Sequence, residues 1–128
     1  MAFNLDSINL NEDGSEMPVL HPVTMEPLLD ENGQAATIRL AGMDSAAYRK
    51  ATNAITNKRI KGGKLVKFTA ERIESDALDL ICECTLQWSG ITVDGEVPKT
   101  AKELYSGRKW LRDQADAWIH DRANYLGN

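Results

Sequence analysis

Apolar residues recur at helical spacing through residues 70–88 and cover most of the circumference that a helix here would have. The polar edge that remains consists of residues four apart, Glu71, Ser75, Asp79, Glu83 and Gln87. A helix with so little polar surface packs against neighbours on several sides. We therefore expect this helix, capped at its N-terminus by Thr69, to lie at the centre of the fold.

Two other long segments carry one apolar face each. A helix over residues 45–60 follows the N-cap residues Asp44 and Ser45, and a last helix spans residues 109–126. A shorter helix over residues 101–105, capped at its N-terminus by Thr100, precedes the last one. The expected fold is mostly α, of the α+β class, with three main helices of which the second is buried between the others.

Strands rather than helices are expected near the N-terminus, because three prolines lie in residues 17–40 and each one excludes a helix interior. Residues 30–33 read Asp-Glu-Asn-Gly, which is typical of a tight turn. The β-prone segments 19–21 and 37–40 on either side predict a small hairpin. A second, shorter hairpin-like loop is predicted around Asp94-Gly95, before the C-terminal helices.

The chain of 128 residues has the length of one domain. Residues 1–16 are polar with isolated apolar side chains, so we expect a flexible arm there and a single globular domain over residues 17–128. An alternative is a short strand or docking peptide, because Phe3 and Leu5 alternate with polar residues, as do Ile8 and Leu10.

Charge and hydropathy exclude several classes of function. The formal net charge is −4 and the pI about 5.1, whereas nucleic-acid binding requires a clustered basic face. No apolar run approaches the roughly 20 residues that span a bilayer. The first residues lack the basic and apolar regions of a secretory signal, so we expect a cytosolic protein without nucleic-acid or membrane partners.

The residues that could perform chemistry do not form a recognisable motif. Cys82 and Cys84 point about 200° apart on a helix and cannot bridge each other, and we expect both to be structural thiols. A phosphate-binding glycine loop and a nucleophile elbow are missing from the sequence. Four residues of the last helix could in principle hold a metal but are more typical of a solvated face: Asp113, Asp116, His120 and Asp121. We expect no catalytic residue, no metal and no cofactor, and a protein that works by binding other proteins.

Several motifs occur in an order that resembles the tail assembly chaperones of long-tailed phages. The resemblance covers roughly residues 17–126. It rests on Gly42-Met43-Asp44-Ser45 before the first helix, Trp88-Ser89-Gly90, the segment Val93-Asp94-Gly95-Glu96-Val97-Pro98, a short helical element over residues 100–105, and Asp121-Arg122-Ala123-Asn124-Tyr125 near the end. One departure is Arg108-Lys109 at a turn where the family has a proline or a small residue.

The resemblance implies a non-catalytic chaperone that binds the tape measure protein and keeps it soluble until the tail tube protein displaces it. It implies a location in the host cytoplasm and absence from the mature virion. Self-association along the long partner would add avidity. The alternative is a structural virion component, such as a tail or head–tail joining protein, although such proteins are usually richer in strands.

The tryptophans are the first candidates for partner contact, because this residue is favoured at the centres of interfaces. Trp110 begins its helix beside basic residues, where an aromatic ring is often half exposed, and is the leading candidate. Trp88 and Trp118 fall on apolar stripes and are most simply core residues. Trp88 and Tyr125 remain secondary candidates for contact with a partner.

Overall fold

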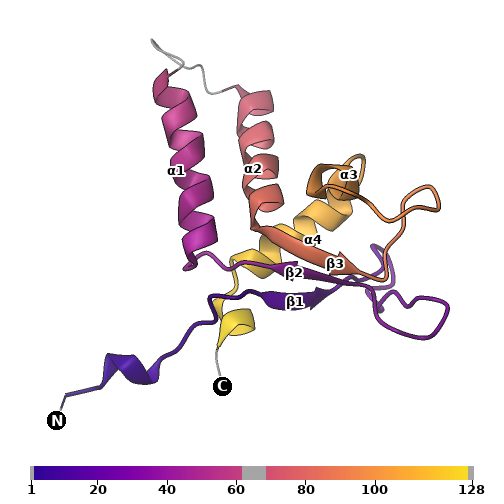
Figure 1. Cartoon of the computed structure of the whole chain (residues 1–128), viewed down its shortest axis with the longest axis horizontal. Coiled ribbons are helices and arrows are strands. Elements are labelled where there is room, and N and C mark those ends of the chain that lie inside the picture. The colour runs from indigo at the N-terminus through magenta and orange to yellow at the C-terminus, as the bar shows by residue number, and fades with distance from the viewer. Residues whose placement is uncertain (1, 62–68, 127–128) are drawn as a thin grey trace.

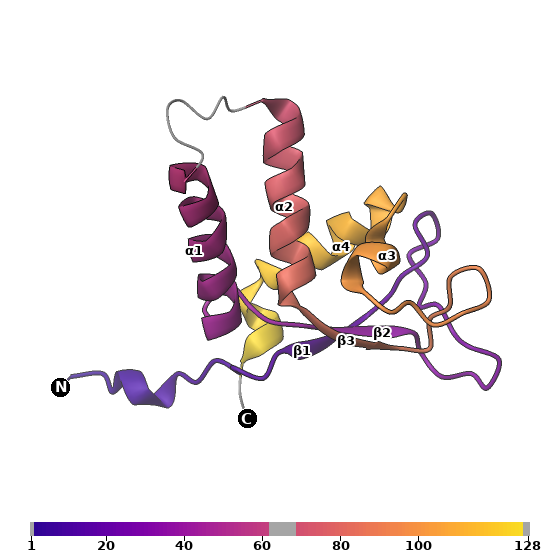
Figure 2. The ribbon, with the colours of Figure 1, turned by 45° about the horizontal axis from the view of Figure 1, so that its top comes forward.

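The computed structural model describes residues 2–61 and 69–126 and has an α+β fold, as expected (Figure 1). A three-stranded antiparallel sheet forms the base. The helices α1 (Ala46–Lys61) and α2 (Ala70–Cys84) run side by side away from it, and α4 (Lys109–Ile119) contacts both α2 and the middle strand (Figures 1 and 2).

The sheet has the order β1-β2-β3, with β1 at Ser15–Pro18, β2 at Thr37–Leu40 and β3 at Thr85–Ser89. The predicted N-terminal hairpin is therefore present, but its first strand lies before residues 19–21 instead of within them. After β1 the Val19 N–H donates to the carbonyl of Ala36, the residue before β2, and the chain then folds into small loops. The predicted turn at residues 30–33 is confirmed, with Gly33 at φ +79°.

The third strand corrects the prediction of one helix through residue 88. The helix ends at Cys84, where the Thr85 hydroxyl donates to the Ile81 carbonyl at 2.7 Å. The next five residues form β3, and four of them pair with β2, so that Trp88 lies opposite Ile38. Leu86 has no partner, because the register shifts between Arg39 and Leu40. Thr and Trp favour strands, and the backbone gains hydrogen bonds from a partner strand that is distant in the sequence.

Helix α2 contacts four other elements of the fold, namely α1, α3 (Ala101–Tyr105), α4 and β3. The Thr69 cap is confirmed, because its hydroxyl accepts from the Arg72 N–H at 3.1 Å. Burial is nevertheless concentrated toward its C-terminal end, at Ile81 and Cys84, whereas Ile73 is 54% exposed. The N-terminal half of α2 extends beyond the sheet with α1 beside it, so the expected enclosure on most sides holds only near the sheet.

The C-terminal region divides into three short elements instead of two helices. The predicted helix α3 and its Thr100 cap are confirmed. The predicted helix over residues 109–126 is wrong in its second half, because α4 ends at Ile119. Asp121 then caps a separate 3-10 helix, η2 (Arg122–Tyr125), by accepting from the Ala123 N–H at 3.0 Å.

The boundary expected between an arm and the domain, after residue 16, falls inside β1. Leu10 pairs with Leu126, and the Asn11 N–H donates to the Tyr125 carbonyl at 2.6 Å. Gly14 is buried at φ +83°, and a side chain there would lie 2.7 Å from the Leu40 carbonyl oxygen. Residues 2–9, which include the 3-10 helix η1 (Leu5–Ser7), are exposed and extend away from the rest of the molecule (Figure 1).

Candidate protein-binding site

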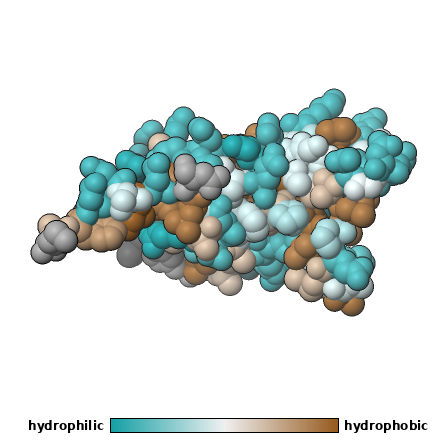
Figure 3. All heavy atoms as spheres, turned by 90° about the horizontal axis from the view of Figure 1, so that it is seen from below, coloured by the Kyte–Doolittle hydropathy of each residue, from teal (hydrophilic) through white to brown (hydrophobic). Residues whose placement is uncertain are grey.

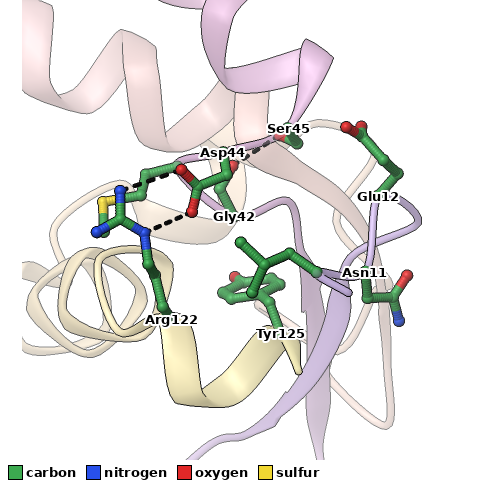
Figure 4. A pocket seen from close by; sticks show the side chains of 9 residues that line it. Asn11, Glu12, Gly42, Asp44, Ser45, Arg122 and Tyr125 are labelled. Carbon is green, nitrogen blue, oxygen red and sulfur yellow. Dashed lines mark hydrogen bonds and ion pairs between the residues drawn. The ribbon is translucent and has the colours of Figure 1, made fainter. Parts of the chain in front are cut away.

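Two of the motifs that carry the family resemblance meet in space, although Asp44 and Arg122 within them are 78 residues apart in the sequence (Figure 4). The Arg122 guanidinium donates to both carboxylate oxygens of Asp44, at 2.7 and 3.1 Å. This hydrogen bonding, followed by the attraction of the two charges, holds the pKa of Asp44 below its ordinary value. Beside the pair, the ring of Tyr125 packs on Gly42. We call these four residues, Gly42, Asp44, Arg122 and Tyr125, the C-terminal clasp.

The clasp is a structural contact and not a ligand site. The space inside it is about 30 Å³, enough for a single water molecule. Tyr125 is only 4% exposed, and burial raises its pKa to about 12. A partner could not reach this ring without displacing it, so the structure does not support the contact role expected of Tyr125.

Trp88 and Trp118 both pack against the hydrophobic core. Trp88 lies opposite Ile38, which is fully buried. Trp118 donates its indole N–H to the Ser15 hydroxyl at 2.8 Å and so ties α4 to β1. Both rings are partly buried. Trp88 is therefore mainly a packing residue with limited surface for a partner.

Trp110 lines an open apolar groove of about 300 Å³, which we call the Trp110 groove. The groove forms where the loop around residues 28–36, the loop at 90–93 and the start of α4 come together. Its side chains include Leu28, Leu29, Ile91, Val93, Arg108 and Trp110. Leu29 is 62% exposed and Trp110 is half-buried, so a partner's apolar side chain can contact exposed apolar surface in the groove.

The Trp110 groove carries little charge. Among the described residues that line it, Arg108 is the only charged one. Its guanidinium donates to the carbonyl oxygens of Ser106 and Leu104, at 2.9 and 3.4 Å, which fixes it at the rim. An apolar floor with one oriented cation suits an amphipathic peptide or helix.

Sequence reasoning identified Trp110 but not the walls of its groove. The walls come from Leu28 and Leu29, which precede the predicted turn at residues 30–33, and from Ile91 and Val93, which precede the predicted Asp-Gly turn. The available signal was the presence of large apolar residues within turn-rich segments. The predicted Asp-Gly turn itself is confirmed, with Asp94 at φ 52° and Gly95 at φ 80° and Val93 paired with Glu96.

The thiols and the last helix offer little chemistry. Burial raises the pKa of Cys84 to about 12 and also raises that of Cys82, so neither is a ready thiolate at neutral pH. His120 contacts Asp116 at 3.3 Å and the Tyr48 hydroxyl at 3.0 Å. Across residues 2–61 and 69–126, no group of three or more His, Cys, Asp or Glu side chains is arranged to hold a metal ion.

No protein-family model, curated protein or solved structure matches this chain. Of the helices in the described ranges, none combines the length and the apolar character needed to cross a membrane.

Proposed function

We propose that this chain is a non-catalytic phage tail assembly chaperone that binds the tape measure protein. In this role it acts in the host cytoplasm, keeps its partner soluble until the tail tube protein replaces it, and is absent from the mature virion. The observation that carries the proposal is the Trp110 groove, an open apolar surface with one cation at its rim. The family resemblance supplies the identity of the partner.

The clasp supports the use of that resemblance. The Gly42–Ser45 and Asp121–Tyr125 motifs are individually weak, since short motifs occur by chance. Here their residues pair with each other through Asp44 and Arg122 and through Gly42 and Tyr125. Because the residues of the two motifs contact each other, the contact is a structural reason for both motifs to be present in one chain.

The mechanism follows from burial. A long helical partner exposes apolar stripes that would aggregate in water, and a groove that covers one stripe at a time lowers the exposed apolar area. Each contact can be weak, because many copies along one partner act together. Weak individual contacts also allow a tube subunit to displace the copies one after another.

The test is co-expression with the tape measure protein, measuring the partner's soluble yield and its co-purification. Trp110→Ala should lower both, because truncating a central aromatic anchor commonly costs 2 kcal/mol or more of binding, about a thirtyfold loss of affinity. Val97→Ala is the matched control, since Val97 is an apolar residue that is 64% exposed outside the groove.

Three outcomes separate the alternatives. Co-purification that persists unchanged in folded Trp110→Ala would refute the groove as the binding site. A soluble yield that does not respond to the wild-type chain would refute the chaperone role. Finding the chain in stoichiometric amounts in purified particles would replace the proposal with a structural virion component.

A further inference from the structure

The N-terminal arm, residues 2–9, exposes three large apolar side chains in a short stretch. Phe3, Leu5 and Ile8 are 69%, 76% and 57% exposed. In Figure 3 hydrophobic and hydrophilic atoms alternate along the arm at the left of the molecule. Such a concentration of exposed apolar side chains on one projecting segment is typical of a surface that a partner covers.

The direction of the arm is set by the contacts at its base. Leu10 pairs with Leu126, and Asn11 donates to Tyr125, on the side of the clasp. From there residues 2–9 lead away from α1 and α2 in both ribbon views (Figures 1 and 2). The arm therefore presents its apolar residues to other molecules and not to its own helices.

A second groove of about 380 Å³, the hairpin groove, lies between α1 and α2. Its floor is apolar and made largely of small or short side chains: Ala51, Ala54, Ile55, Leu78 and Cys82. Small residues leave room for side chains that enter from outside. The hairpin groove is thus a second apolar surface, separate from the Trp110 groove.

The rim of the hairpin groove has a small excess of basic residues. It carries Lys50, Lys58 and Lys102, with Asp79 and Glu83 on the α2 side. Within the described residues none of the three lysines forms an ion pair. These ammonium groups are available to carboxylates that approach from another molecule.

Helix α1 and the first 16 residues carry opposite charge. Helix α1 has five Lys and Arg residues and no Asp or Glu, in a protein whose net charge is −4. The first 16 residues have four Asp and Glu residues and no Lys or Arg. Asp6 stands within the apolar part of the arm, and Glu12 and Asp13 follow it. The arm, apolar with one carboxylate at Asp6, and the groove, apolar with one more lysine than carboxylates at its rim, are complementary in charge.

We propose that the arm of one copy docks in the hairpin groove of a second copy. Phe3, Leu5 and Ile8 lie on the floor of the groove, and Asp6, the one acidic residue of the arm, faces the lysines of the rim. Because arm and groove are different surfaces, the contact is heterologous and adds copies head to tail. This self-association does not depend on the identity of the partner of the Trp110 groove.

Disulfide trapping tests the contact, because Cys82 already lies in the groove and is half-buried while Cys84 is enclosed. One full-length chain carries Ser7→Cys and Cys82→Ala, which places its accessible thiol in the arm and keeps all three apolar residues. It is mixed with the isotopically labelled wild-type chain under mild oxidation. We expect a mixed dimer linking position 7 of one copy to Cys82 of the other, identified by mass.

Charge reversal provides a second test of the contact. Lys50→Glu with Lys58→Glu in the wild-type partner should reduce the mixed dimer by about tenfold, as an energetic loss of about 1.4 kcal/mol would. Arg49→Glu with Lys61→Glu changes the charge of the same helix equally, at exposed positions that do not line the groove, and should reduce it far less. Circular dichroism verifies that both double variants are folded.

Two results would overturn the proposal. In a single chain carrying Ser7→Cys and the native Cys82, an internal disulfide in a monomer would mean that the arm folds back onto its own groove. The second result is that no mixed disulfide forms, and that analytical ultracentrifugation gives the same monomer mass for the full chain and for a chain lacking residues 2–9. It would mean that the arm does not join two copies.

Discussion

Arg122 and Asp44 lie 78 residues apart in the sequence and meet in a two-point ion pair, with N–O distances of 2.7 and 3.1 Å. The pair joins the C-terminal 3-10 helix to the turn that begins α1. Both groups are exposed to solvent, so their main effect is on geometry, and screening limits their contribution to stability. The geometry they fix places Tyr125 against Gly42 and the Tyr125 carbonyl against Asn11.

The pH dependence of this ion pair is the first prediction. The pKa of Asp44 is lower in the folded state than its ordinary value of 3.8, so the pair stabilises the fold above that value. Its contribution is lost as the pH falls through the lower folded pKa. Asp44→Asn should therefore be less stable than wild type at neutral pH, and the difference should shrink as the pH falls below 3.8. Urea unfolding across this range measures it, and a constant difference would contradict the assigned cause.

Gly42 gives a second prediction, because a Cβ atom there would lie 2.9 Å from the Tyr125 ring. Gly42→Ala should cost about 1–3 kcal/mol of unfolding free energy through overpacking. In a Tyr125→Leu background the same substitution should cost less, since the obstructing ring is gone. Equal costs in the two backgrounds would show that the ring is not the obstacle.

Local signals in the sequence identified most helices and turns. The caps at Thr69 and Thr100 and the turns at Gly33 and Gly95 follow from side-chain hydrogen bonds and positive φ, both of which depend on neighbouring residues alone. The strand at Thr85–Ser89 depends instead on pairing with β2, almost 50 residues earlier in the chain. Its apolar residues continue the helical stripe, so periodicity could not separate it from α2.

In the candidate site, too, the features set by neighbouring residues were predictable and those set by distant segments were not. Trp110 was identified from its position at the start of a helix, but the groove around it requires three segments to converge, and no local pattern encodes that. The attachment of residues 10–16 was also missed, because Leu10 and Asn11 are held by backbone pairing to Leu126 and Tyr125. Backbone pairing at an irregular segment leaves little trace in side-chain periodicity.

The core contribution of α2 gives a third prediction, and the structure ranks three of its residues. Ile81 is 3% exposed, Leu80 is partly buried and Ile73 is 54% exposed. Replacement by Ala should cost roughly 2–5 kcal/mol at Ile81, about 1–2 at Leu80 and under about 0.5 at Ile73. Urea unfolding of the three variants provides the measurement. A loss at Ile73 as large as that at Ile81 would show that the outer half of α2 is covered.

Truncation of the N-terminus gives a fourth prediction. Removing residues 2–9 should change Tm by less than about 2 °C, because that segment contributes no buried side chain. Removing residues 2–16 should lower Tm by more than about 8 °C. The longer deletion takes away buried Gly14, the hydroxyl of Ser15 that accepts from Trp118, and half of β1. Similar Tm values for the two truncations would mean that residues 10–16 do not contribute to the stability of the sheet.

The last prediction concerns alkaline pH. Burial raises the pKa of Tyr125 to about 12 from an ordinary value of 10.0, because the enclosed phenol is favoured in its neutral form. A folded-state pKa above the unfolded value means that stability is unaffected below pH 10 and falls as the pH rises from there toward 12. Burial also raises the pKa of Tyr105 and Tyr48, which adds to the same trend. Tyr125→Phe keeps the ring against Gly42 and removes the ionisable group. Its unfolding free energy should therefore decline less than that of the wild type over this range, and parallel declines would show that ionisation of Tyr125 is not a cause.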